Sequence, residues 1–196
     1  MESLDPDNLR DMGKDWNLVG GDYADSLRRF REHGLAVYGT FVFGYDNDDR
    51  RVVQRSIDFA REQRLFLAAF NHLVPFPGTP LYGRLEREGR LLKPRWWLDP
   101  DSRVGDVSFR PKKLEPGELE ELCLYARRQF YSWGSIWQRL WDRRANVRSL
   151  PMLGVYLGLN LEAHFDIDRR QGLRLGAGLS EWMPIDEPIP IRAGNI

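Results

Sequence analysis

The chain has 196 residues, of which 42% are hydrophobic and 30% are charged, and this composition is typical of a globular protein with a sizeable core. Lysine plus arginine and aspartate plus glutamate number 29 each, so no net field draws the protein toward nucleic acid or an anionic membrane. The single cysteine, Cys123, excludes an internal disulfide framework and a metal site built from cysteines alone.

The N-terminal residues and the longest apolar stretches bear on location. Residues 1–5 lack the basic and apolar regions of a signal peptide, and a lone cysteine fits a reducing compartment, so we expect a cytoplasmic protein. Apolar stretches near residues 37–45 and 150–161 are shorter than the ~20 residues that a membrane helix requires. We therefore predict no membrane span.

Helices and strands alternate in the first half of the chain. An Asp-Pro pair at residues 5–6 favours the start of a short helix, and apolar residues at helical spacing predict helices over 22–33 and 52–60. Residues 35–43 and 66–73 are nearly continuous in apolar residues, which is typical of strands buried on both faces. This order implies right-handed crossovers and a parallel sheet, in a barrel or in an open sheet.

The second half of the chain is mainly helical. Prolines make residues 75–80 a rigid loop, a short helix is expected over 81–88, and residues 96–111 are irregular and rich in aromatic side chains. A long helix with apolar residues at steps of three and four is predicted from Glu115 to Trp141, with Gly134 as a candidate site for a kink, and a last helix over 152–170.

Tryptophans and arginines interleave between residues 125 and 148, which permits two interpretations. A basic aromatic face is typical of a surface that binds nucleic acid or a membrane. The tryptophans nevertheless repeat at the spacing of a core-facing stripe, with the arginines on a solvated face. We favour the core-facing stripe and predict no nucleic-acid partner.

The residue types that commonly bind metals are sparse. His33, His72 and His164 lie far apart in the sequence without paired carboxylates at ligand spacing, so we predict ordinary structural roles for them and no metal site. Cys123 falls among apolar helix residues and is expected to be a small core residue.

Three segments carry motifs whose order along the chain is informative. Residues 2–14 begin Glu-Ser-Leu-Asp-Pro, residues 34–46 contain a predicted strand with two glycines, and residues 71–81 contain a Pro-Gly-Thr-Pro loop. They resemble the passage after the fourth strand, the fifth strand and the sixth strand of cobalamin-linked radical S-adenosylmethionine proteins. Further motifs lie at residues 88–92, 96–100, 105–107 and 130–133. They resemble the C-terminal region of one branch of this family, which includes methyltransferases acting on hopanoid and chlorophyll-type substrates.

The resemblance implies an α/β fold class, with part of a parallel TIM-like β/α barrel followed by a mainly helical C-terminal extension. It places strands five and six with their flanking helices in residues 1–110, the helical extension in 111–175 and a flexible tail in 176–196. A complete barrel typically needs ~250 residues. We therefore expect the missing N-terminal half of the barrel in the same or a separate polypeptide.

The resemblance also implies residues that bind the cofactor S-adenosylmethionine: Glu2, Ser3, Gly39, Gly44, Asn71, Leu73 and Pro75. The first two would lie near its ribose and amino group, and the last three near its adenine. At the two glycines, a missing side chain would let cofactor and backbone approach closely. Without the resemblance, the glycines would be interpreted as packing points within a sheet.

The family holds a [4Fe-4S] cluster through three thiolates, whereas this chain has one cysteine. We expect that neither the cluster nor S-adenosylmethionine binds stably to the chain alone, and we name no catalytic residue and no metal ligand. The implied function is to position cofactor and a small-molecule or lipid-like substrate for radical chemistry, such as methyl transfer, in a full-length protein; participation of cobalamin stays open. The alternative is a non-catalytic module that docks a strand edge on a partner barrel.

Overall fold

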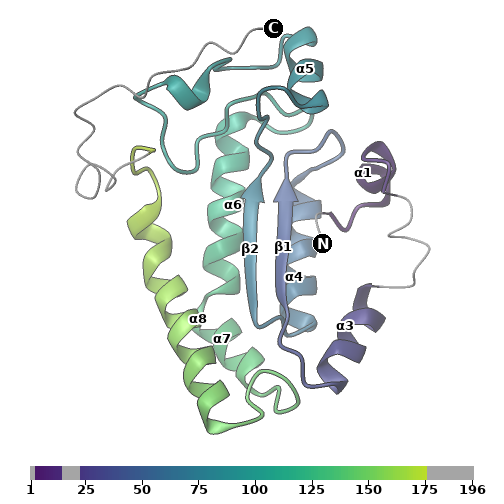
Figure 1. Cartoon of the computed structure of the whole chain (residues 1–196), viewed down its shortest axis with the longest axis vertical. Helices are drawn as coiled ribbons and strands as arrows, with labels where there is room; N and C mark the ends of the chain where they lie inside the picture. Colours follow the sequence, from purple (N-terminus) through teal and green to yellow (C-terminus); the bar gives the residue numbers. More distant parts are fainter. Residues whose placement is uncertain (1–2, 15–22, 176–196) are drawn as a thin grey trace, which may run out of the picture.

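The computed structural model describes residues 3–14 and 23–175, so Glu2 and the predicted tail over 176–196 lie outside the described residues. Figure 1 labels the elements. In chain order they are α1 (Pro6–Asp11), α3 (Tyr23–Glu32), β1 (Tyr38–Phe43), α4 (Arg50–Glu62), β2 (Leu67–His72), α5 (Pro80–Arg87), the 3-10 helix η1 (Trp96–Leu98), α6 (Pro116–Phe130), α7 (Trp133–Leu140) and α8 (Leu150–Arg170). Among these helices, none has the length and apolarity needed to cross a membrane.

Side-chain caps begin several of these helices. An oxygen of the capping residue accepts hydrogen bonds from first-turn N–H groups at Asp5 of α1, Asp49 of α4, Thr79 of α5 and Ser149 of α8. Such a cap contributes about 1 kcal/mol, because it satisfies donors that the helix itself leaves unpaired. The predicted helices before and after each strand are confirmed.

The two strands pair in parallel. Their register runs from Tyr38 opposite Leu67 to Phe43 opposite His72, and α4 connects them. The predicted parallel α/β arrangement is therefore confirmed, and it consists of a two-stranded sheet within the described residues.

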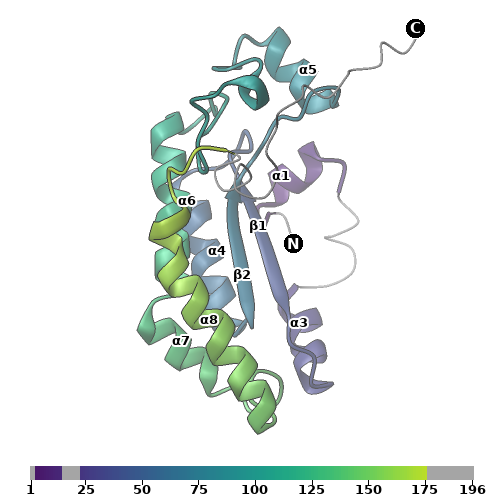
Figure 2. The same ribbon diagram turned by 60° about the vertical axis from the view of Figure 1, so that its left-hand side comes forward.

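The strands differ from the prediction in their burial, because only one face of the sheet is covered. Phe41 and Phe70 are completely buried and stack with ring centroids 5.1 Å apart, whereas Tyr38 on the other face is 60% exposed. Thr40 and Asn71 are exposed on that second face too. Figure 1 looks onto this bare face, with α4 behind the arrows, and Figure 2 shows α4 and α6 together on one side of the sheet. The prediction of strands buried on both faces is wrong for the described residues.

The main apolar core fills the space between the covered face and the helices, and a second, smaller cluster contains Phe66, Ile136 and Tyr156. The main core includes Ile57 of α4, Phe109 of the long connection, and Leu119 and Cys123 of α6, all of them buried. The expected core role of Cys123 is thus confirmed. The core crosses the boundary that the sequence places at residue 110, which stays a prediction.

Side chains close the outer edge of β2, where another strand would otherwise pair. The hydroxyl of Tyr131 donates to the Ala68 carbonyl at 2.9 Å and accepts from the Ala68 N–H at 3.2 Å. The Nε of Arg127 donates to the Phe70 carbonyl at 3.0 Å. Because these groups occupy the donors and acceptors of the ladder, the sheet does not extend beyond β2.

Arg139 continues this closure at the start of β2, where its side chain is fully buried. Its guanidinium donates to the carbonyls of Leu65, Phe66 and Phe130 at 2.9, 3.2 and 3.0 Å, and to the Asn160 side chain at 3.0 Å. It also lies 3.8 Å from the centre of the Phe130 ring. Burial lowers the pKa of Arg139 to about 10, so the group remains a cation at neutral pH.

The long helix predicted from Glu115 to Trp141 is divided in two. The first part, α6, ends at Phe130, and Ser132 caps a new helix, α7, by accepting from the Ser135 N–H. After the break, Ile136 faces the core, and the predicted core stripe emerges on the surface. The exposed fractions are 58%, 61% and 57% for Trp133, Trp137 and Trp141. The core-facing interpretation is therefore wrong for these three tryptophans.

Candidate functional site

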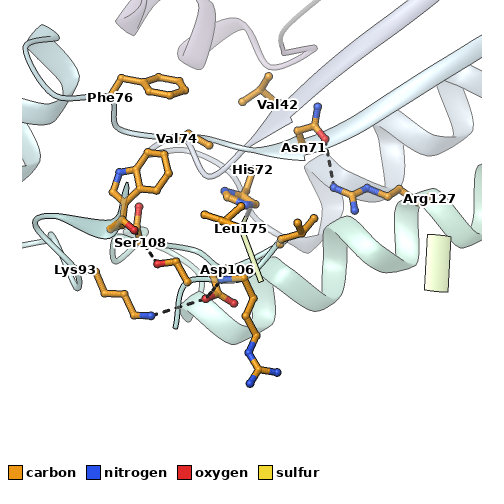
Figure 3. A pocket seen from close by; sticks show the side chains of 15 residues that line it. Val42, Asn71, His72, Val74, Phe76, Lys93, Asp106, Ser108, Arg127 and Leu175 are labelled. Atoms are coloured by element: carbon orange, nitrogen blue, oxygen red, sulfur yellow. Dashed lines mark hydrogen bonds and ion pairs between the residues drawn. The ribbon is translucent and has the colours of Figure 1, made fainter. Parts of the chain in front are cut away.

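A cavity of about 540 Å³ opens at the carboxyl end of β2. Ligand sites of parallel α/β folds commonly occur at this end of the strands. The walls come from the strand ends, from the connection between α5 and α6 (residues 88–115), from α6 and from the segment after α8. The lining residues are Val42, Asn71, His72, Val74, Phe76, Lys93, Trp96, Ser102, Arg103, Val104, Gly105, Asp106, Ser108, Arg127 and Leu175. Figure 3 shows these side chains converging from separate segments.

His72 is the titratable ring in this cavity. Burial lowers the pKa of His72, so the imidazole is neutral at neutral pH. Its Nδ1 lies 3.1 Å from the Leu73 carbonyl oxygen, which can only accept, and Nδ1 therefore carries the proton. The other ring nitrogen, Nε2, is left as a hydrogen-bond acceptor.

Charged groups form the polar part of the cavity. Arg127 donates to the Asn71 side-chain oxygen at 3.2 Å, in addition to its bond to the strand. On the opposite wall, the Lys93 ammonium lies 2.9 Å from the carboxylate of Asp99 and 3.8 Å from that of Asp106. Arg127 has no carboxylate partner among the described residues and so leaves positive charge at this site.

Aromatic side chains form the apolar wall. The rings of Phe76 and Trp96 are in edge contact with centroids 5.9 Å apart, and the indole N–H of Trp96 donates to the Pro75 carbonyl at 3.2 Å. This bond ties the proline loop after β2 to the 3-10 helix η1. The cavity can therefore hold an apolar molecule with polar groups directed at His72 and Arg127.

A second cavity of about 540 Å³ lies at the end of β1, beside α1 and α5. Leu73 and Asp46 line it together with Arg84. Burial raises the pKa of Asp46, but Lys112, Arg90 and Arg84 lower it by more, so the net pKa lies below its usual value. In this cavity the carboxylate of Asp46 is held by ion pairs with Arg84, Arg90 and Lys112.

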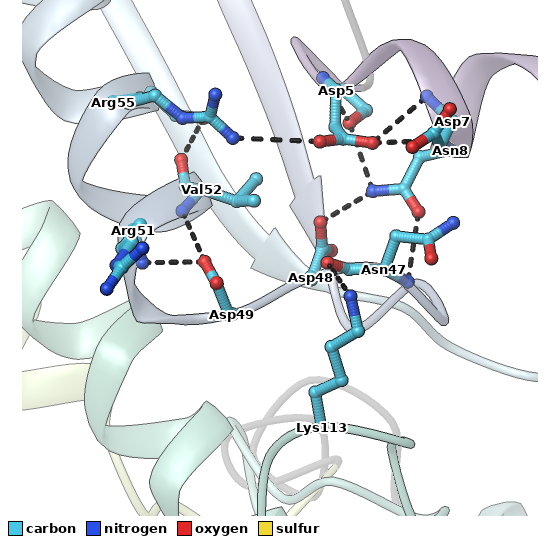
Figure 4. A network of polar contacts seen from close by, with 12 residues as sticks. Asp5, Asp7, Asn8, Asn47, Asp48, Asp49, Arg51, Val52, Arg55 and Lys113 are labelled. Carbon is cyan, nitrogen blue, oxygen red and sulfur yellow. Dashed lines mark hydrogen bonds and ion pairs between the residues drawn. The ribbon is translucent and has the colours of Figure 1, made fainter.

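The loop after β1 is held by a buried carboxylate, Asp48, which Figure 4 shows among its partners. It accepts from the backbone N–H groups of Gly44 and Tyr45 at 2.8 and 3.0 Å and from the Asn8 side chain at 2.6 Å. Burial raises the pKa of Asp48 to about 6, and the three donors oppose this rise. The adjacent Asp49 caps α4, whereas Asp48 fixes the turn itself.

The residues predicted to bind the cofactor are distributed over several environments. Asn71 lines the first cavity and Leu73 the second, while Pro75 is buried beneath Trp96. Ser3 is 3% exposed, and its hydroxyl accepts from the Asp5 N–H at 3.1 Å. The structure brings Asn71 and Leu73 to the same end of the sheet, but it does not join the set in one cavity.

The two predicted glycines lie against the protein core. Gly39 is buried within β1 and shares its face with Phe41. Gly44 has a φ of +103°, and a Cβ at this position would approach the Leu119 side chain to 2.8 Å and the Phe109 ring to 3.0 Å. Close packing thus explains why glycine is required at residue 44. Their contact with a cofactor stays a prediction.

The sequence reasoning missed three residues of the first cavity. His72 was expected to have an ordinary structural role, and Arg127 and Trp96 carried no site prediction. His72 follows Asn71 directly at the strand end, which is a signal that was available. The other two come from distant segments, and only the fold brings them together.

A metal centre has no support in the described part of the chain, where no group of three or more histidine, cysteine or acidic side chains could hold an ion. Burial raises the pKa of the Cys123 thiol to about 12, so this thiol stays protonated and does not supply a thiolate ligand. The described residues therefore do not fit a [4Fe-4S] cluster.

Comparisons with known proteins give a consistent chemistry. No protein-family model matches the chain. It is 31% identical over 145 residues to the bacteriochlorophyllide d C-12(1)-methyltransferase of Chlorobaculum tepidum, which covers 74% of this chain and 30% of that protein. It is 30% identical over 109 residues to the hopanoid C-2 methylase of Rhodopseudomonas palustris, covering 56% of this chain and 19% of that protein.

A third relative is the bacteriochlorophyllide d C-8(2)-methyltransferase of Chlorobaculum tepidum, 23% identical over 136 residues, which cover 69% of this chain and 30% of that protein. Each relative is a methyltransferase or methylase. The chain spans less than a third of the length of these proteins. It is thus similar, at low identity, to one part of a group of methylating enzymes.

Proposed function

We propose that this chain is the C-terminal portion of a radical S-adenosylmethionine methyltransferase. Its role there is to hold cofactor and substrate at the carboxyl ends of β1 and β2. The observation that carries the proposal is the bare face of a parallel strand pair that ends in a cavity. Similarity to methyltransferases over most of the chain supports the type of reaction.

The geometry of the sheet supports an incomplete barrel. Parallel sheets are normally covered on both faces, in barrels by helices outside and by packed side chains or ligand inside. Here helices cover one face, and Tyr38, Thr40 and Asn71 are exposed on the other. Side chains close the edge of β2, so further strands would be added beside β1.

The chain's own residues would position ligands in this assembly. Asn71 lies on the bare face with Arg127 as its partner, and its amide can still donate to a bound adenine or substrate oxygen. His72 offers Nε2 as an acceptor, and Trp96 and Phe76 exclude water on the apolar side. These side chains bind and orient, and no described residue supplies the radical.

The cluster, and with it the cleavage of S-adenosylmethionine, would come from another part of the full-length protein. In the relatives, this is the part that lies outside the segment similar to this chain. When bound to such a cluster, S-adenosylmethionine supplies the radical in this family. Consistent with this division, the one cysteine of the chain is a buried core residue. Participation of cobalamin remains open. Docking of this chain as a non-catalytic module remains an alternative, and because side chains close the edge of β2, such docking would use the edge of β1.

The test is a chimera with a relative. The matching segment of the bacteriochlorophyllide d C-12(1)-methyltransferase is replaced by this chain, and formation of 5′-deoxyadenosine and of methylated product is measured. The chimera is expected to assemble its cluster and to cleave S-adenosylmethionine. Asn71→Ala in the chimera should lower the rate by roughly tenfold or more, because the proposed hydrogen bond from its amide to the bound ligand is lost.

The matched control is Gln54→Ala, which removes an exposed amide on α4 and should leave the rate unchanged. A folded chimera that carries its cluster but does not cleave S-adenosylmethionine would refute the proposed function. An Asn71→Ala rate equal to that of the control would refute only the role of Asn71.

A further inference from the structure

A second surface lies on α7 and α8, away from both cavities. Its centre, here called the tryptophan face, consists of Trp133 and Trp137 of α7, Trp141 at the C-cap of α7 and Phe165 of α8. These four side chains are 56% to 61% exposed. Trp133 contacts Phe165 with centroids 6.4 Å apart, and Trp137 contacts Trp141 at 6.4 Å. Because residues four apart share a helix face, the three tryptophans form one continuous apolar ridge.

The neighbouring helix also exposes apolar side chains. In α8, Leu150 is 83% exposed, Val155 50% and Leu159 39%. Residues 149–161 contain no charged side chain. A helix with this composition would normally bury its apolar side chains, so the exposure calls for an occupant.

The exposed charges in the segment that contains the three tryptophans have one sign. Between residues 133 and 161, every exposed charged side chain is an arginine: Arg143, Arg144 and Arg148. Arg143 lies 6.0 Å from the ring of Trp141, and none of the three forms an ion pair among the described residues. Beyond this segment, the acidic groups of α8 are Glu162, Asp166 and Asp168; Asp166 is paired with Arg170, and Asp168 with Arg128 at 2.6 Å.

The missing part of a barrel is a poor fit for this surface. Side chains from α6 and α7 close the edge of β2, so no strand is added on the side where α7 and α8 lie, as Figure 1 shows. The tryptophans of α7 lie opposite Ile136 and Arg139, which face the sheet. They are therefore directed away from the region where a sheet would be completed.

A second copy of this chain fits poorly too. In a two-fold dimer the same patch forms both halves of the interface, so Arg143 and its neighbours would approach their own equivalents. Like charges brought together in an interface weaken it. An occupant with a negatively charged surface and an apolar interior would fit both the arginines and the tryptophans.

We infer that the tryptophan face docks on the surface of an anionic lipid bilayer. Tryptophan concentrates at the boundary between headgroups and acyl chains, where its ring is apolar and its N–H remains wet. Arginines at the rim are attracted to anionic headgroups, each contributing about fivefold in affinity. The chain then lies on the membrane with α7 parallel to its surface, as interfacial amphipathic helices do.

The test is flotation of the purified chain with vesicles of phosphatidylcholine containing phosphatidylglycerol. We expect binding to these vesicles and weaker binding to vesicles of phosphatidylcholine alone. The triple variant Trp133→Ala, Trp137→Ala and Trp141→Ala should bind at least roughly tenfold more weakly, because the apolar area that the tryptophans bury in the bilayer is lost. Arg143→Gln, Arg144→Gln and Arg148→Gln together should abolish the preference for anionic vesicles.

The matched control is Trp97→Ala, which removes an exposed tryptophan of η1 and should leave binding unchanged. Exposed side chains contribute little to folding, and thermal unfolding of each variant verifies this. A measurement without variants is quenching of the native tryptophan fluorescence by brominated lipids. Absence of binding and of quenching, or equal binding of the triple variant, would overturn the inference, as would a dimer that the triple variant abolishes.

Discussion

The two faces of the β1–β2 sheet have opposite environments, although both strands are nearly continuous in apolar residues. On the covered face, Phe41, Phe43 and Phe70 are at most 2% exposed and are in ring contact. On the bare face, Tyr38 is 60% exposed and Thr40 is exposed as well. The covered face thus holds the described residues together, and the bare face remains for a partner segment or ligand.

The largest test of this comparison replaces one aromatic residue on each face. Phe70→Ala should lower the free energy of unfolding by about 3–5 kcal/mol, because it removes a buried ring and leaves a cavity. Tyr38→Ala should change it by about 0.5 kcal/mol or less, as for other exposed residues. Urea unfolding of both variants measures the difference, and equal losses would show that the bare face is covered in solution.

A somewhat smaller loss is expected at the closed edge of β2. Arg139→Met removes a buried cation that satisfies three carbonyl oxygens, and it should cost about 3 kcal/mol because these acceptors remain buried without donors. The control is Arg128→Met, which removes an exposed ion pair and should cost about 0.5 kcal/mol or less. If both variants unfold at the same urea concentration, side-chain closure does not stabilise the edge.

The smallest effect concerns the loop at the end of β1 and depends on pH. The folded pKa of Asp48 is about 6 against an ordinary 3.8, so the folded protein retains a proton that the unfolded chain releases between these values. This stabilisation is fully present below about pH 4 and is lost as the pH rises through 6. Asp48→Asn should cost about 1 kcal/mol at neutral pH, because the N–H₂ group of the new asparagine would face a donor that the carboxylate now accepts from.

The stability advantage of the wild type over Asp48→Asn should therefore shrink as the pH rises from 4 to 6. Urea unfolding at several pH values measures it. The control Asp101→Asn alters an exposed carboxylate, and its difference from the wild type should stay flat. A difference that grows with pH for Asp48→Asn would contradict the raised pKa.

Local signals in the sequence were sufficient for most helices and strands. Asp5 and Pro6 begin α1 as expected, and the order of helix and strand gave the parallel pairing of β1 and β2. These features depend on interactions within a few residues or on the handedness of one crossover. The tertiary environment of the same residues was harder to predict.

The break between α6 and α7 shows why. Apolar residues continue at helical spacing through residue 141, so the pattern favoured one helix, and Ser132 was not interpreted as a new cap. Once the chain bends there, the later tryptophans no longer follow the core. Periodicity predicts which residues share a face, but not what that face meets.

The candidate site was predicted in part for a related reason. Asn71 lies beside the cavity because it ends a strand, which the sequence indicates. Arg127 and Trp96 reach the same cavity from segments 25 or more residues away along the chain, and no local pattern reports such proximity. The predicted contacts of the cofactor with Gly39 and Gly44 stay open.

The hydrogen bonds of Arg139 have a practical consequence for recombinant work. They join the residues just before β2 to the end of α6 and to Asn160 in the middle of α8. A shortened chain that stops after α7 would lack this last partner and would open the guanidinium to water on one side. Expression boundaries should therefore retain α8 in full, even when only the cavity is of interest.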